Sequence, residues 1–207
     1  LSNNCGNILI TGDSDITSAA AAFDLWYNHG KGYPEGVRVT FDENFTGTVI
    51  GNMEYGAENP TENWTEKTAL VIKGGTFIGD FVKASSFEEK ANITVYGGTF
   101  SDADVADYCA EYHKATADGD KFTVAPVYVA SVNDEKYFTL QKAVDEAENG
   151  DTVTLLGNAN GDGVVVPSGK EIIFDFGGYT YTVDGETVGS AGTKTLAMQL
   201  LKGAKVT

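Results

Sequence analysis

The sequence is poor in positive charge. Of its 207 residues, 14 are Lys or Arg and 30 are Asp or Glu, so the formal net charge is −16. Arg38 is the one arginine. A protein that binds nucleic acid uses basic residues to neutralise phosphates, and attraction to an anionic membrane surface needs them as well. The charge therefore argues against both partners and is typical of a well-solvated exterior.

Long apolar runs and cysteine are also scarce. No apolar run approaches the ~18 residues of a membrane-spanning helix, so we expect no direct membrane insertion. The two cysteines, Cys5 and Cys109, either form a disulfide that closes a long loop or are two separate small core residues. A lone pair carries no spacing pattern that decides between these readings.

Motifs for catalysis are missing from the sequence. No His/Cys cluster has the spacing of a zinc site, and neither G-x-S-x-G nor a recognisable Cys-His arrangement is present. We therefore predict no catalytic residue, and no cofactor apart from the calcium considered below.

Proline is rare, with four residues, whereas glycine is abundant, with 25. This balance indicates many tight turns, as in all-β folds. Two stretches share one pattern: Leu70–Phe77 reads LVIKGGTF and Ile93–Phe100 reads ITVYGGTF, and Gly74 and Gly97 are 23 residues apart. Each copy has a run that favours a strand, a glycine pair that allows a bend, and a Phe directed at a core.

This repeat predicts one coil of a β-solenoid per copy, with Phe77 and Phe100 stacked in adjacent coils. The leucine-rich repeat, which has a similar period, is disfavoured because its leucine pattern is missing. Thr48–Met53, Glu171–Thr180 and Thr195–Thr207 resemble further coils. The last one stops within a predicted strand, without the polar cap that a solenoid end needs. We therefore expect a longer protein, in which other modules of the same chain are neighbours.

Three segments show the apolar spacing of amphipathic helices. The residues with this spacing are Ala19, Ala22, Phe23, Trp26 and Tyr27 in the first, Val105, Tyr108, Cys109 and Tyr112 in the second, and Leu140, Ala143, Val144 and Ala147 in the third. The first helix is expected to end at His29-Gly30. The second, over 104–114, is expected to dock on the last coil and shield its edge.

The order strand, helix, strand and coils occurs twice along the chain. Strands are expected at 7–11, 37–41 and 127–130, and a closing strand at 122–124. This order predicts a β-helix module over 1–125 and the truncated start of a similar module over 126–207, with the boundary near Pro126.

The second opening is specific enough to carry a resemblance. Tyr137–Ala147 followed by Gly150–Leu156, and Val166–Ile172 followed by Asp175–Tyr179, resemble the first coils of right-handed parallel β-helix modules of the pectate-lyase-like superfamily. Such modules recur in large surface proteins of gut bacteria. The resemblance implies a mainly β fold of solenoid coils with short capping helices, located outside the cell, either secreted or on the bacterial surface. It specifies the fold better than the activity, because one fold hosts many functions.

One segment suggests a metal. Asn158, Asn160 and Asp162 place oxygen side chains at positions 1, 3 and 5, and Gly163 follows at position 6, as in an EF-hand calcium loop. Position 12 should be a bidentate Glu, but it is Gly169. The alternative is an ordinary turn rich in Asn, Gly and Asp.

Exposed aromatic residues are the other candidate site, because Tyr and Trp give a large contact area at a small entropy cost. Several lie outside any clean core period, and the candidates are Tyr27, Tyr33, Tyr55, Trp64, Tyr179 and Tyr181. The alternative is that they pack beneath long loops.

Three functions remain open at this stage. The first is a non-catalytic adhesion module that binds a host protein or glycan, with mucosal immunoglobulin as one concrete partner that the resemblance implies. The second is a polysaccharide lyase or hydrolase, by analogy with the superfamily. The third is a passive stalk that projects other domains.

Overall fold

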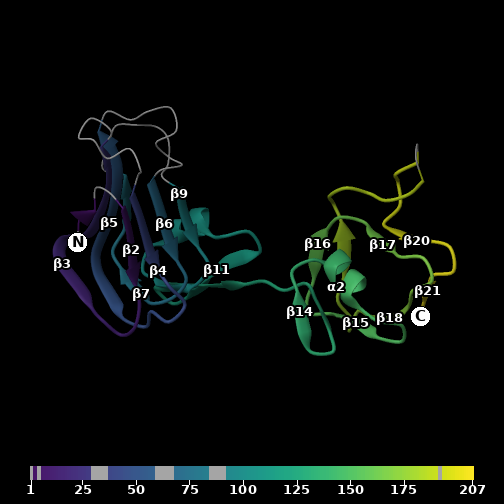
Figure 1. Ribbon diagram of the computed structural model, residues 1–207. Helices are drawn as coiled ribbons and strands as arrows, with labels where there is room; N and C mark the ends of the chain where they lie inside the picture. Colours follow the sequence, from purple (N-terminus) through teal and green to yellow (C-terminus); the bar gives the residue numbers. More distant parts are fainter. Residues whose placement is uncertain (1, 4–5, 29–36, 59–67, 84–91, 191–192) are drawn as a thin grey trace. The chain divides into compact units, whose positions relative to one another are not determined.

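The structure is a computed structural model that describes residues 2–3, 6–28, 37–58, 68–83, 92–190 and 193–207. The chain divides into two compact units, Leu1–Pro126 (unit 1) and Val127–Thr207 (unit 2). Both units are mainly β, and the described strands of each belong to more than one sheet (Figure 1).

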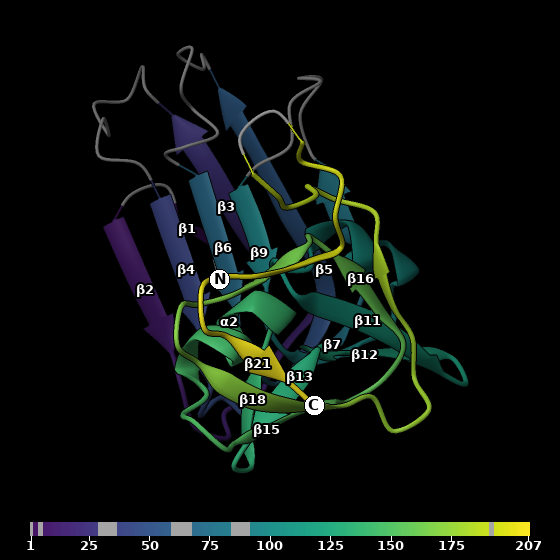
Figure 2. The ribbon, with the colours of Figure 1, turned by 90° about the vertical axis from the view of Figure 1, so that its right-hand side faces the viewer.

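The described strands of unit 1 form two sheets, and the chain alternates between them (Figure 2). The smaller sheet contains β2 (Gly6–Ile10), β4 (Val37–Phe41), β6 (Thr68–Ile72) and β9 (Asn92–Val95). The larger sheet contains β1 (Ser2–Asn3), β3 (Ile16–Asn28), β5 (Thr48–Glu58), β7 (Thr76–Ile78), β8 (Phe81–Lys83), β10 (Gly98–Phe100), β11 (His113–Asp118) and β12 (Lys121–Pro126). All pairs among β1 to β10 are parallel.

We call one passage through both sheets a layer. Among the described residues, the layers of unit 1 are β2–β3, β4–β5, β6–β7–β8 and β9–β10, and β1 lies parallel beside β3 before the first of them. Each layer lies in register beside the one before it, as when Phe100 pairs with Phe77 and Ile72 pairs with Phe41.

Alternation of side chains places the core between the two sheets. Val37, Val39 and Phe41 are buried, whereas Arg38 between them is exposed, as the period of two in a strand requires. The predicted stack of Phe77 and Phe100 is confirmed: both rings are buried, their centroids are 5.0 Å apart, and their planes differ by 9°.

The glycine pairs form the bend between the two sheets. Gly75 and Gly98 have positive φ angles of 95° and 114°, a region that suits glycine. A Cβ on Gly75 would lie 2.4 Å from the Phe45 ring, and one on Gly97 would lie 2.5 Å from the Lys73 carbonyl oxygen. The bend therefore requires glycine both for its conformation and for the close approach of the neighbouring layer.

The predicted helix over Ala19–Tyr27 is wrong, because this segment belongs to β3. Phe23 and Leu25 are buried, whereas Asp24 between them and Trp26 after them are half-buried, which is strand alternation. Register shifts between Thr17 and Phe23 interrupt that alternation. The apolar residues of this strand therefore recur at a spacing that resembles that of a helix. The alanine run has high helix propensity, but pairing with β5 overrides it.

The predicted helix over 104–114 is also wrong in extent and type. Asp102 caps the N-terminus of the 3₁₀ helix η2 (Ala103–Tyr108), and its side chain accepts a hydrogen bond from the Asp104 N–H. Val105 and Tyr108 are buried as expected, but Tyr112 is 43% exposed and has a positive φ of 59°. The chain then forms the antiparallel hairpin β11–β12, which pairs with β10, so η2 and this hairpin together cover the last layer.

Unit 2 has two layers of three strands each. The layers are β16 (Ala159–Gly161), β17 (Val164–Val166) and β18 (Glu171–Asp175), followed by β19 (Tyr181–Val183), β20 (Met198–Leu200) and β21 (Lys205–Val206). Each strand of the second layer is parallel to its counterpart in the first. Before them come β13 (Ala130–Val132), β14 (Glu135–Tyr137), α2 (Leu140–Glu146) and β15 (Thr152–Leu155), and β15 pairs with β13 and β18.

Helix α2 is the predicted third helix, and its apolar positions Leu140, Ala143, Val144 and Ala147 are all buried. Its Gln141 covers the edge of β17. The Gln141 side-chain oxygen accepts from the Val165 N–H at 2.7 Å, and its amide donates to the Val165 carbonyl at 3.0 Å. The side chain thus takes the place of a neighbouring strand and closes an edge that would otherwise invite pairing.

The stacked phenylalanines generate a stability prediction. Replacing Phe77 or Phe100 with Ala should lower the free energy of unfolding by about 3–5 kcal/mol, because each change leaves a cavity in a close-packed core. Urea unfolding measures this loss. Ile78→Ala is the control, since Ile78 is 43% exposed and should cost far less. A phenylalanine variant as stable as the control would show that the ring faces solvent.

Tyr108 generates a pH prediction. Burial raises the pKa of Tyr108 well above its ordinary value, and its hydrogen bond to Tyr55, with the two hydroxyl oxygens 3.4 Å apart, adds to this. The unfolded chain loses the same proton near pH ~10. The neutral hydroxyl therefore contributes its full stability below that pH, and this is lost as the pH rises further. The urea midpoint should fall more steeply above pH ~10 in the wild type than in Tyr108→Phe; equal slopes would contradict the assignment.

Candidate functional site

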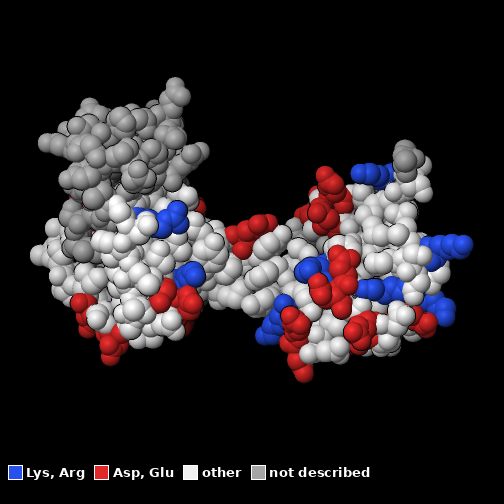
Figure 3. Space-filling view, viewed as in Figure 1, with Lys and Arg blue, Asp and Glu red and all other residues white. Residues whose placement is uncertain are grey.

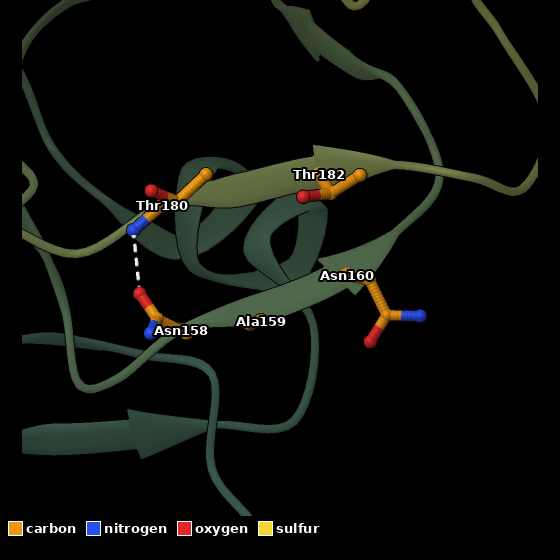
Figure 4. A pocket seen from close by; sticks show the side chains of 5 residues that line it. All are labelled: Asn158, Ala159, Asn160, Thr180 and Thr182. Atoms are coloured by element: carbon orange, nitrogen blue, oxygen red, sulfur yellow. Dashed lines mark hydrogen bonds between the residues drawn. The ribbon is translucent and has the colours of Figure 1, made fainter.

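A shallow polar hollow lies across β16 and β19 of unit 2 (Figure 4). Its volume is about 330 Å³, and it is lined by Asn158, Ala159, Asn160, Thr180 and Thr182. Asn160 pairs with Thr182 and Ala159 pairs with Tyr181 in the parallel register. Alternate residues of a strand share a face, so Asn158, Asn160, Thr180 and Thr182 form two adjacent polar columns. All four residues are exposed.

Hydrogen bonds from side chains tie the two layers together at this hollow. The Asn158 Oδ1 accepts from the Thr180 N–H at 2.9 Å, which Figure 4 marks with a dashed line. The Asn160 side-chain amide donates to an Asp184 carboxylate oxygen. The Asp162 Oδ1 accepts from the Glu186 N–H at 2.7 Å. The side chains of Asn158, Asn160 and Asp162 are therefore held in place by bonds to the next layer.

Tyr181 lies beneath the hollow and supports it. Its hydroxyl donates to the Asp162 carbonyl oxygen at 2.8 Å. Burial raises the pKa of Tyr181, and the carboxylates of Asp162 and Asp184 add to the rise. A Cβ on Gly161 would lie 2.7 Å from this hydroxyl oxygen, so glycine there leaves room for the tyrosine.

The structure gives the predicted calcium ligands a different arrangement. Asn158, Asn160 and Asp162 lie on or beside the extended strand β16, which spaces their side chains along a line, whereas a calcium loop curls its ligands around one point. Within the described ranges, no group of three or more His, Cys, Asp or Glu side chains is placed to hold a metal ion. All three residues carry hydrogen bonds between layers, and Asn158 and Asn160 line one side of the hollow.

Of the predicted aromatic residues, the structure describes the side chains of Tyr55, Tyr179 and Tyr181. The prediction that Tyr55 is an exposed binding residue is wrong, because its side chain is 3% exposed and belongs to the core of unit 1. Tyr179 is 46% exposed, as predicted, whereas Tyr181 is half-buried. Tyr33 and Trp64 lie outside the described residues, as does the side chain of Tyr27.

The hypothesis of a disulfide between Cys5 and Cys109 stays a prediction, because Cys5 is not among the described residues. Cys109 is half-buried, and its thiol donates to the Val105 carbonyl oxygen at 3.6 Å. Burial raises the pKa of this thiol, which disfavours the reactive thiolate.

Sequence reasoning missed the threonines. Thr180 and Thr182 complete the hollow, and the residue pairs Asn-x-Asn and Thr-x-Thr, one period apart, were the available signal. In unit 1 a row of threonines crosses five neighbouring strands in register, in the order Thr48, Thr76, Thr99, Thr123 and Thr116. The repeated Gly-Gly-Thr-Phe motif contains two of these five.

We compared the chain with protein families, curated proteins and solved structures. No protein family, curated protein or solved structure matches the chain. Neither helix in the described part of the chain is long and apolar enough to cross a membrane.

Proposed function

We propose that the chain is a non-catalytic binding module built as a parallel β-helix, which acts outside the cell and recognises a glycan through the β16/β19 hollow. The parallel in-register layers of both units support the solenoid part of this proposal. The hollow itself is the observation that carries the binding part.

The chemistry of the hollow favours a sugar. Amide and hydroxyl groups donate and accept hydrogen bonds without a net charge, which matches the hydroxyl groups of a saccharide. The volume of the hollow, about 330 Å³, is at the small end of the range for ligand sites and suits one or two sugar rings. Tyr179, the residue before Thr180, adds an exposed aromatic surface.

The charge around the hollow narrows the ligand to a neutral glycan. Asp162, Asp184 and Glu186 are exposed at one end of β16 and β19, and their carboxylates would repel a uronate or another anionic sugar. This acidic border also disfavours the alternative of a lyase, because lyases of the resembled superfamily act on acidic polysaccharides.

An array of neutral and acidic oligosaccharides tests the proposal. The wild type should bind neutral glycans, and the double variant Thr180→Val/Thr182→Val should bind them about tenfold more weakly, because two hydrogen-bonding groups are lost while the β-branched shape is kept. Thr116→Val in unit 1 is the matched control and should bind normally, and the melting temperatures should agree.

Three results would contradict the glycan assignment. They are binding to acidic glycans alone, equal binding by the wild type and the double variant, and no glycan binding at all. Capture of a protein from mucosal secretions with no glycan bound would favour the adhesion alternative with a host protein partner. Release of unsaturated uronates would favour the lyase alternative.

A further inference from the structure

We propose that unit 1 carries a second sugar site, formed by Tyr96, Tyr112 and His113, which we call the aromatic cluster. The ligand is a neutral pyranose whose apolar face lies on a tyrosine ring. The cluster shares no residue with the β16/β19 hollow, so this inference goes beyond the proposed function and stands or falls separately. Three observations carry it.

The first observation is the exposure of the two tyrosines. Tyr96 follows β9 and Tyr112 precedes β11, and each side chain is 43% exposed. Val95, the residue before Tyr96, is buried, so alternation directs Tyr96 away from the core. No other aromatic side chain among the described residues of unit 1 is as exposed. Exposed tyrosines are typical of binding surfaces, because a tyrosine gives a large contact area at a small entropy cost.

The second observation is the backbone conformation of Tyr112. The His113 N–H donates to the Ala110 carbonyl oxygen at 2.9 Å and closes a turn, in which Tyr112 has a positive φ of 59°. Glycine or asparagine normally occupies such a position, and the other described non-glycine residues with a positive φ are Asn133 and Asp134. A tyrosine there costs free energy, and residues held in such conformations are concentrated at ligand sites. The tyrosine is therefore not explained by the turn itself.

The third observation is that the two tyrosines lie on neighbouring segments. The Ala110 N–H donates to the Val95 carbonyl oxygen at 2.8 Å, which places the turn beside Tyr96. The His113 ring meets the Tyr96 ring edge-on, with centroids 5.3 Å apart and planes at 84°. Tyr112 is the residue before His113, so their Cα atoms are about 3.8 Å apart. The cluster therefore combines β9 with the turn that leads into β11.

The chemistry of the cluster indicates a small neutral sugar. The C–H groups on one face of a pyranose form an apolar patch that packs on an aromatic ring, and tyrosine hydroxyls both donate and accept hydrogen bonds. Glu111, the residue before Tyr112, is exposed. Its carboxylate accepts strong hydrogen bonds from sugar hydroxyls and would repel an acidic sugar. A stable protein partner would need about 800 Å² on each side, which is far more than two tyrosine rings offer.

Mapping of NMR chemical shifts tests the site directly. Methyl β-galactoside, methyl β-glucoside and methyl α-mannoside are each titrated into the isotope-labelled full chain. At least one of them should cause saturable shifts at the amides of Tyr96 and of residues 110–113. Tyr96→Ala should weaken this binding about three- to tenfold, as expected for one aromatic contact. Tyr179→Ala removes a similarly exposed tyrosine from unit 2 and should leave binding at the cluster unchanged.

Tyr112→Gly separates a binding role from a structural one. Glycine suits the positive φ at this position, so the variant should keep the urea midpoint of the wild type while it binds the sugar about three- to tenfold more weakly. The proposal is overturned if none of the three sugars causes saturable shifts at the cluster. It is also overturned if Tyr112→Gly binds as tightly as the wild type, or if a lower urea midpoint is its only effect.

The same spectra read the two proposed sites separately. Shifts confined to the amides of β16 and β19 would support the hollow and overturn the aromatic cluster. Shifts confined to Tyr96 and residues 110–113 would support the cluster and count against the hollow. Thr180→Val/Thr182→Val should leave the shifts at the cluster unchanged, because none of its residues belongs to the hollow.

Discussion

The in-register stacking of layers determines most of the other features of this protein. Each strand of a layer lies beside its counterpart in the next, so inward side chains of successive layers contact one another, and most of them are apolar. Phe100 is parallel to Phe77, and the Phe77 ring contacts Phe41 edge-on with centroids 5.1 Å apart. Aromatic pairs of this kind add about 0.5–1.5 kcal/mol beyond the area that they bury. The glycine bends follow from the same constraint, because the neighbouring layer approaches too closely for a Cβ.

Stacking also explains where polar residues gather. Outward positions of successive layers form columns, and in unit 2 two such columns bring Asn158 and Asn160 beside Thr180 and Thr182. Bonds to the next layer fix the side chains of Asn158 and Asn160 without a rigid loop, and a fixed polar surface loses little entropy when a ligand binds. A stack also needs its ends covered, and the chain uses a hairpin with a 3₁₀ helix in unit 1 and an α-helix in unit 2.

The sequence predicted features that depend on a repeat and missed features that depend on register. Gly-Gly-Thr-Phe identified Phe77 and Phe100 correctly, and the spacing of Leu140, Ala143, Val144 and Ala147 identified α2. The helix over Ala19–Tyr27 was wrong because a strand irregularity imitated helical spacing. The helix over 104–114 was too long because nothing in the sequence marks the positive φ of Tyr112. The hollow was half-predicted, since Asn158 and Asn160 were noted for calcium, while their neighbours Thr180 and Thr182 come from the next layer.

A double-mutant cycle on Phe77 and Phe100 tests the central claim, which is stacking in register. Phe77→Leu, Phe100→Leu and the double variant are compared by urea unfolding, with leucine chosen to limit the cavity. If the rings stack face to face, the two single losses should differ from the double loss by about 0.5–1.5 kcal/mol. Phe23→Leu with Phe100→Leu, three layers apart, should be additive. Additive losses for Phe77 and Phe100 would contradict the layered account.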